Sequence, residues 1–177
     1  MLYLIIGFLI LAFIFVLLFS YLFAGFSLAP WVPSPKKDRE RISKLADLKP
    51  GQSFYELGCG DGRVCRYIAK NNPGARIIGI ELSMPVFMVA KFLGLFGPKN
   101  SEIRFGSIFS ADLSDADVLF TYALINPMKN RLKPKLYKEL KKSAKLISYK
   151  FEIDNWEGNG SVDRPGKDAV PIYIYEL

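Results

Sequence analysis

Apolar and polar positions divide the chain into an apolar N-terminal stretch and a longer part in which short apolar runs alternate with helical patterns. The first 35 residues carry no charge. The run from Leu2 to Phe23 is long enough to cross a bilayer as a helix, for which roughly 20 apolar residues suffice. We therefore expect a transmembrane helix over residues 1–28, a proline-rich linker over 29–36 and a separate domain over 37–177.

The pattern of the longer part predicts strands that alternate with helices. Helical patterns occur at residues 37–48, 63–71 and 86–96. Apolar runs predict strands that end near Leu57, Glu81, Phe109, Tyr122 and Phe151, and a last strand over residues 170–175. This order predicts an α/β fold with a doubly wound, mainly parallel sheet of the Rossmann-like type. Because little chain follows the fifth strand, we expect a shortened C-terminal part.

Three glycines, Gly58, Gly60 and Gly62, follow the first predicted strand, and a helical pattern begins directly after them. Glycine is favoured where the chain needs positive φ or where a ligand touches the backbone, and a helix start offers free N–H groups. A dinucleotide-binding turn has its third glycine one residue later. The spacing, with the acidic Glu56 two residues before Gly58, therefore favours a ligand that carries a cation. A glycine-rich turn without a ligand is the alternative.

A second acid, Glu81, ends the second predicted strand about twenty residues beyond the glycines. At the carboxyl end of a parallel strand, a carboxylate can accept hydrogen bonds from both hydroxyls of a ribose. The alternative is an exposed glutamate at the end of a strand. Together with the glycine turn, Glu81 predicts a nucleoside-containing ligand.

The stretch Glu56-Leu-Gly-Cys-Gly-Asp-Gly resembles motif I of class I S-adenosylmethionine (SAM) methyltransferases. The resemblance implies that the turn passes under the methionine part of SAM and that Glu56 helps to hold its amino group. It further implies contacts along the strand ends. The proline-rich segment is either a plain linker or a strap over the cofactor, with Ser34 offering a hydroxyl. The cofactor-binding residues that we expect are Ser34, Glu56, Gly58, Cys59, Gly60, Asp61, Gly62, Glu81, Leu82, Ser107, Ile108 and Thr121.

Further pieces resemble the small single-span protein-lysine N-methyltransferases, whose mitochondrial members modify the adenine nucleotide translocase and the ATP synthase c subunit. These pieces are Val32-Pro-Ser-Pro35, Asp117-Val-Leu-Phe-Thr-Tyr-Ala-Leu124, Leu132-Lys-Pro-Lys-Leu136 and Ser148-Tyr-Lys-Phe151 leading to Trp156. The resemblance implies methyl transfer to a lysine amine of a membrane-associated protein, with Tyr122 orienting that amine as the catalytic residue. A lipid or small-molecule acceptor and a non-catalytic SAM-binding module remain alternatives.

Charge places the predicted domain and limits its partners. The net charge of +7 lies entirely beyond residue 35, and basic residues follow the apolar run directly. The positive-inside rule therefore predicts a single-pass protein of the cell membrane with a cytoplasmic domain, and an organelle membrane is the alternative. A signal peptide cleaved near Ala29 is a rival for the apolar run. The tether makes nucleic acid a less favoured partner. The chain has no histidine and no metal-ligand spacing, so we expect no metal.

Two segments have either a structural or a docking role at this stage. The helical pattern over residues 86–96 is apolar almost all round, which predicts either a buried helix or contact with a membrane. The basic segment over residues 129–145 predicts either a solvated helix face or docking to anionic lipid or an acidic partner.

Overall fold

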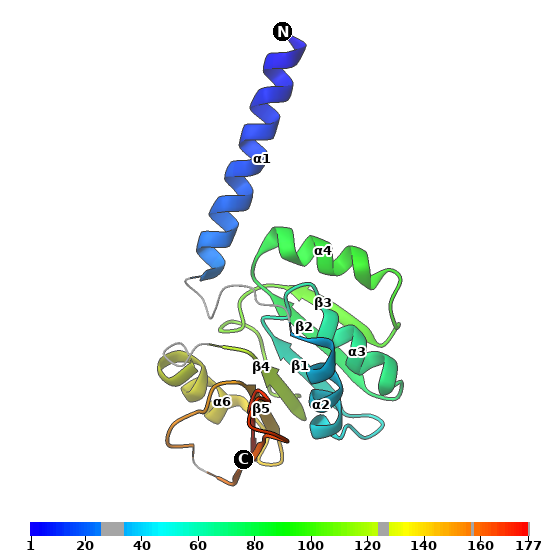
Figure 1. The fold of residues 1–177 in the computed structure, drawn as a ribbon, viewed down its shortest axis with the longest axis vertical. Coiled ribbons are helices and arrows are strands. Elements are labelled where there is room, and N and C mark those ends of the chain that lie inside the picture. The colour runs from blue at the N-terminus through cyan, green and yellow to red at the C-terminus, as the bar shows by residue number, and fades with distance from the viewer. Residues whose placement is uncertain (26–33, 124–127, 157, 177) are drawn as a thin grey trace.

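The computed structural model describes residues 1–25, 34–123, 128–156 and 158–176 (Figure 1). A long helix, α1 (Leu2–Gly25), stands away from a separate α/β domain (Figure 1). The stretch Leu2–Phe19 has a mean hydropathy of 3.1, and none of it is buried. By length and composition, α1 qualifies as a membrane span. The expected linker and the cleavage-like sequence near Ala29 fall mostly at residues 26–33, outside the described residues.

The domain is built on a seven-stranded sheet in the order β3-β2-β1-β4-β5-β7-β6. The strands are β1 (Ser53–Leu57), β2 (Arg76–Glu81), β3 (Ser101–Phe105), β4 (Val118–Thr121), β5 (Lys145–Tyr149), β6 (Gly160–Asp163) and β7 (Ile172–Glu176). The first five strands are parallel, and β7 runs antiparallel to both β5 and β6. The predicted doubly wound, mainly parallel fold is confirmed.

Helices cover both faces of this sheet. They are α2 (Lys36–Ala46), α3 (Arg63–Asn71), α4 (Met84–Gly94), a π-helical turn η1 (Met128–Leu132) and α6 (Lys133–Glu139). Successive strand residues point to opposite faces, so alternate residues enter separate cores. Phe54 and Ile77 pack in one core with α2 and α3, whereas Tyr55 and Ile78 pack in the other with η1 and α6. The almost continuous burial of β1, β2, β4 and β5 follows from this double cover.

The structure differs from the predicted elements in the C-terminal part. The sequence predicted no strand between the one ending near Phe151 and the last one over residues 170–175, but residues Gly160–Asp163 form β6. This edge strand is mostly exposed and has no apolar alternation; its pairing with β7 defines it, with Val162 beside Tyr173. The C-terminal part nevertheless completes a seven-stranded sheet with β6 and β7, and the described residues between β5 and β6 form no helix. The third strand ends at Phe105, before Phe109, because Gly106 turns the chain with a φ of 155°.

A buried ionic network holds α2 on the sheet. Asp38, which is 1% exposed, accepts hydrogen bonds from the Tyr149 hydroxyl at 2.7 Å and from the Arg41 guanidinium at 3.0 Å. Arg41 also reaches the Asp163 carboxylate of β6 at 2.6 Å. Burial, followed by the bond to Asp38, raises the pKa of Tyr149. The N-terminal helix of the domain is thereby tied to its last strands.

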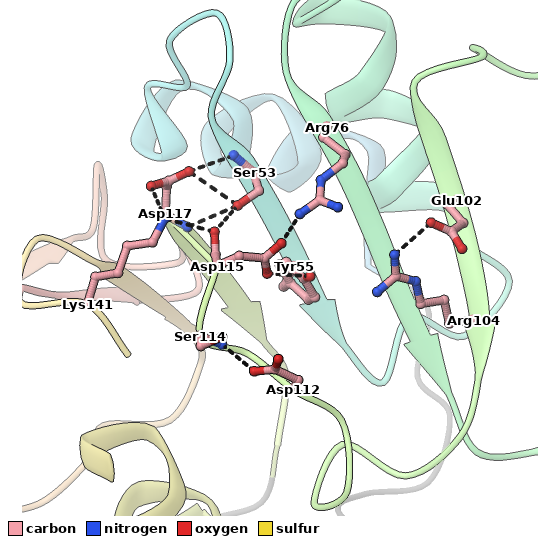
Figure 2. A network of polar contacts seen from close by, with 10 residues as sticks. All are labelled: Ser53, Tyr55, Arg76, Glu102, Arg104, Asp112, Ser114, Asp115, Asp117 and Lys141. Atoms are coloured by element: carbon pink, nitrogen blue, oxygen red, sulfur yellow. Dashed lines mark hydrogen bonds and ion pairs between the residues drawn. The ribbon is translucent and has the colours of Figure 1, made fainter. Parts of the chain in front are cut away.

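A second polar network joins the start of β1 to the start of β4 (Figure 2). The Ser53 amide donates to the Asp117 carboxylate at 2.8 Å, and the Tyr55 hydroxyl donates to Asp115 at 2.6 Å. Lys141 pairs with Asp117 at 2.9 Å. These bonds hold the loop before β4 at the amino ends of the strands, away from their carboxyl ends.

Several lysines of the basic segment are engaged within the fold. Besides Lys141, Lys135 pairs with Glu139 at 2.6 Å and donates to the Ala111 carbonyl at 2.7 Å. Lys145 donates to the Leu45 carbonyl at 3.0 Å. These lysines pair with acids and donate to backbone carbonyls, and the contacts connect α2 and the β3–β4 loop to the rest of the domain. They favour the structural role of the segment over the docking role.

Candidate active site

The carboxyl ends of the central strands lie together at one edge of the sheet. Leu57 of β1 is in register with Ile80 of β2 on one side and with Thr121 of β4 on the other. Glu81 is in register with Phe105 of β3. The chain leaves β1 between β2 and β4, which is the switch point at which open α/β sheets bind ligands. Most of the predicted site residues follow directly on these strand ends.

The glycine turn after β1 adopts the conformation that its sequence predicts. Gly58, Gly60 and Gly62 have φ values of 80°, 57° and 73°, in the left-handed region that favours glycine. The amides of Gly58 and Cys59 donate to the Ile80 carbonyl at 3.0 and 2.9 Å, so the turn is fastened to β2. A Cβ atom added at Gly58 would meet nothing within 4 Å. The backbone at Gly58 is therefore open to the close approach of a ligand.

Glu81 has two roles in this arrangement. Its carboxylate is buried, accepts the Gly60 amide at 2.9 Å and accepts the Ser83 amide at 2.7 Å. Burial raises its pKa, and the backbone hydrogen bonds act in the opposite direction. Each carboxylate oxygen retains a lone pair that can accept a hydroxyl. The predicted contact with ribose would therefore come from a side chain that also shapes the glycine turn.

Glu56 lies beneath the start of α3 with 4% of its surface exposed. Its carboxylate accepts hydrogen bonds from the Cys65 amide at 3.0 Å and the Cys65 thiol at 2.9 Å. Burial raises the pKa of Glu56 to about 8, against the opposing effect of these bonds. The carboxyl group is therefore largely protonated near neutral pH, and a nearby cationic group would favour its ionised form.

The predicted residues around the turn differ in burial and in hydrogen bonding. Asp61 pairs with Arg63 at 2.8 Å and accepts the Arg63 amide, so it serves the first turn of α3. Although burial acts to raise it, the contacts with Arg63 lower the pKa of Asp61. Cys59 is buried below the turn, and Leu82 is half-buried after Glu81. Ser34 is buried just before α2, and its contact with the cofactor stays a prediction.

Thr121 and Tyr122 lie where the sequence predicted, at the carboxyl end of β4. Thr121 is fully buried, and its hydroxyl has no hydrogen-bond partner in the part of the chain that the structure describes. A buried, unpartnered hydroxyl at this edge suits a polar ligand group. Tyr122 meets Tyr149 edge to face, with ring centroids 4.8 Å apart, and lies 6.1 Å from the Phe151 ring. The sequence pattern alone did not assign these two aromatic neighbours to the site.

The loop after β3 forms one side of a cavity of about 250 Å³. Ser107 lines this cavity together with Gly106, Ile80 and Arg104, and Ile108 is buried behind it. The Ser107 hydroxyl accepts the Phe109 amide at 3.2 Å, which fixes the turn. Two of the predicted cofactor-binding residues thus lie at or next to a cavity.

Gly79, in the middle of β2, supports the site, and its role was not predicted from the sequence. A Cβ atom there would lie 2.7 Å from the Cys59 sulfur and 2.9 Å from the Cys65 sulfur. The two free cysteines therefore fill the space that a side chain at Gly79 would take. A glycine inside an apolar strand is the available sequence signal, because it marks a close approach.

Comparison with known proteins agrees with this geometry. The family model described as the ANTKMT methyltransferase domain matches residues 56–159. A protein-lysine N-methyltransferase of Saccharolobus islandicus (strain REY15A) is 34% identical over 153 residues, which are 84% of this chain and 93% of that protein. An RNA methyltransferase from Salinibacter ruber, solved with S-adenosyl-L-homocysteine, is similar with a TM-score of 0.74 and 28% identity, over 82% of this chain and 93% of that one. The chain therefore belongs to the family of the ANTKMT methyltransferase domain and is a SAM-dependent methyltransferase.

Proposed function

We propose that this protein transfers methyl groups from SAM to the ε-amine of a lysine in a protein at or in the membrane. The observation that carries the proposal is the glycine turn, held open by Glu81 at the switch point, in a chain 34% identical to a relative named protein-lysine N-methyltransferase. The acceptor assignment rests on that relative, and the donor assignment rests on the geometry of the turn.

The residues around the turn suit SAM. When bound, SAM would supply a methyl group on a sulfonium: a neutral amine attacks the methyl carbon, the carbon–sulfur bond breaks, and S-adenosylhomocysteine leaves as a neutral thioether. In our proposal Glu56 faces the amino group of SAM, and Gly58 to Gly62 allow the backbone to approach it. Glu81 and Leu82 hold the ribose, Ser107 and Ile108 border the adenine, and Thr121 lies near the methionine part. The unpartnered Thr121 hydroxyl supports this fit.

Tyr122 and its aromatic neighbours provide what the acceptor lysine needs. The amine must be neutral to act as a nucleophile, and an apolar surrounding lowers the pKa of a lysine. The rings of Tyr122 and Phe151 form an edge at which the alkyl part of a lysine can pack, and the Tyr122 hydroxyl can accept a hydrogen bond from the amine. Positioning and exclusion of water are the main requirements of such a transfer.

Anchoring of the domain follows from α1. We propose that α1 crosses the membrane and that the basic residues after it keep the domain on the cytoplasmic side. The lack of charge in α1 and the absence of burial along Leu2–Phe19 support this role. A domain held at the membrane would then meet membrane proteins at a higher local concentration than soluble proteins.

The acceptor can be identified with labelled SAM. The full chain in detergent, incubated with source-cell membranes and methyl-labelled SAM, is expected to label a discrete protein band. Hydrolysis of that band should release methyl-lysine. Label in the lipid extract, or in RNA added in parallel, would contradict the lysine assignment and reassign the acceptor.

Replacement of Tyr122 by phenylalanine separates positioning from donor binding. Tyr122→Phe is expected to lower kcat by about 100-fold, the range for loss of a positioned polar group, without change in SAM affinity. Tyr67→Phe on α3, a tyrosine near Lys44, should leave both unchanged. Steady-state kinetics and calorimetry measure the two quantities. An unaltered kcat in Tyr122→Phe would remove this residue from the mechanism.

Protonation of Glu56 predicts a proton release on SAM binding. Because burial raises its pKa to about 8, the free protein holds a proton there that a cationic ligand displaces. Calorimetry at about pH 6.5 in buffers of different ionisation enthalpy should show release of close to one proton, and Glu56→Gln should abolish the release. In the free protein, stability should fall as pH rises from the unfolded value near 4.5 toward about 8. Buffer-independent binding to the unaltered protein would refute this prediction.

A further inference from the structure

Helix α4 and the two residues that follow it expose large apolar side chains. We call these residues the α4 patch: Met84, Met88, Val89, Phe92, Leu95 and Phe96. Phe92 is 60% exposed and Phe96 is 80% exposed, and their rings contact each other edge to face. The inner face of α4 is also apolar, because Ala90 is fully buried and Phe87 packs on the core. A short helix that is apolar on its outer face as well as its inner one needs a second apolar surrounding.

The α4 patch continues onto the neighbouring strand. Phe105 at the end of β3 is 49% exposed, and its ring centroid lies 5.5 Å from that of Phe87. On the opposite face of β3 the alternating residues carry exposed charges, with Arg104 paired with Glu102 (Figure 2). The exposed apolar surface of the domain is therefore concentrated at α4 and the adjoining end of β3.

The position of α1 indicates what covers the α4 patch. Helices α1 and α4 contact each other, and α4 lies at the end of the domain from which α1 projects (Figure 1). A bilayer that holds α1 therefore lies next to this end of the domain. Lys91 on α4 and Lys99 after it are exposed, and the sequence has no acidic residue between Glu81 and Glu102, whose carboxylate is near Lys91. A run of apolar side chains that includes cations and no acid within it suits a surface of anionic lipid.

We propose that the α4 patch lies in the interfacial layer of the same bilayer that α1 crosses. This inference rests on the proposed anchoring through α1. The patch then acts as a second contact that fixes the orientation of the domain as well as its distance from the bilayer. Since α4 begins three residues after Glu81, the candidate SAM site is held at a set height over the lipid. The site would accept lysines that are presented close to the membrane surface.

Fluorescent labelling of the full chain in vesicles tests the proposal. The vesicles contain about one-third anionic lipid and, in separate preparations, a lipid with a doxyl quencher near the head group or near the middle of the acyl chain. Single cysteines labelled with an environment-sensitive dye are placed at Phe92→Cys, at Asn71→Cys on the exposed end of α3 and at Leu9→Cys in α1. The native Cys59 and Cys65 are buried, and burial raises the pKa of Cys65, so they remain unlabelled. Retained SAM affinity shows that each variant is folded.

The three positions separate the outcomes. We expect the dye at Phe92→Cys to shift to shorter wavelength and to be quenched several-fold more than the dye at Asn71→Cys, with quenching also at Leu9→Cys. Equal behaviour at positions 92 and 71, with quenching at position 9, would overturn the docking of α4 but leave the anchor intact. A shielded dye at 92 that doxyl lipid does not quench would mean that protein covers the patch, which also overturns the proposal. Loss of quenching at position 9 would refute the anchoring itself.

Discussion

The Gly58→Ala variant is expected to lose about 100-fold or more in SAM affinity while it still folds. Its new methyl group would meet no protein atom within 4 Å, so it enters the space that the ligand is proposed to occupy. The free energy of unfolding should fall only by the local cost of a non-glycine residue at a φ of 80°, which is about 1–2 kcal/mol. Calorimetric titration with SAM and thermal unfolding measure the two effects separately.

Gly51→Ala provides the matched control for this prediction. Gly51 has a φ of 86°, and a Cβ atom there also meets nothing within 4 Å. It lies in the turn before β1, at the opposite end of the strand from Gly58. Both variants should lose a similar amount of stability, and only Gly58→Ala should lose affinity. Equal SAM affinity in the two variants would show that the ligand does not approach the backbone at Gly58.

The second large effect is expected for Gly79→Ala, which should destabilise the fold by about 1–3 kcal/mol. The added Cβ atom would lie 2.7 to 2.9 Å from atoms of Cys59 and Cys65, so β2 and the glycine turn must move apart. Because Cys59 belongs to that turn, SAM affinity should fall as well. Denaturant unfolding with and without SAM measures both losses.

Gly94→Ala is the control for crowding. It replaces a helical glycine at the end of α4, where a Cβ atom meets nothing within 4 Å. The substitution should leave stability unchanged or raise it by up to about 1 kcal/mol, through the better helix propensity of alanine. If Gly79→Ala loses no more stability than Gly94→Ala, the two cysteines adapt to the added methyl group without strain.

Local spacing made the central part of the site predictable. The order of strand, glycine turn and helix depends on backbone φ angles and on free amides at a helix start, which neighbouring residues define. Glu81 was predicted because strand ends in a parallel sheet meet at one edge. The short edge strand β6 was not predicted, because its exposed residues have no apolar alternation and only the pairing with β7 defines it.

The sequence by itself determined the apolar helix α1 and the α/β class, since each depends on runs or spacings within a few tens of residues. It indicated the cofactor through the resemblance of the glycine turn to motif I. Tertiary structure decided the properties that depend on distant neighbours. Burial, together with the surroundings of Glu56, determines the protonation of that carboxyl group. The fit of Gly79 against two cysteines is a contact between strand and turn. The contact of Lys141 with Asp117 gives the basic segment a structural role. Helix α4 remains exposed because, among the elements that the structure describes, none of the domain packs on its outer face.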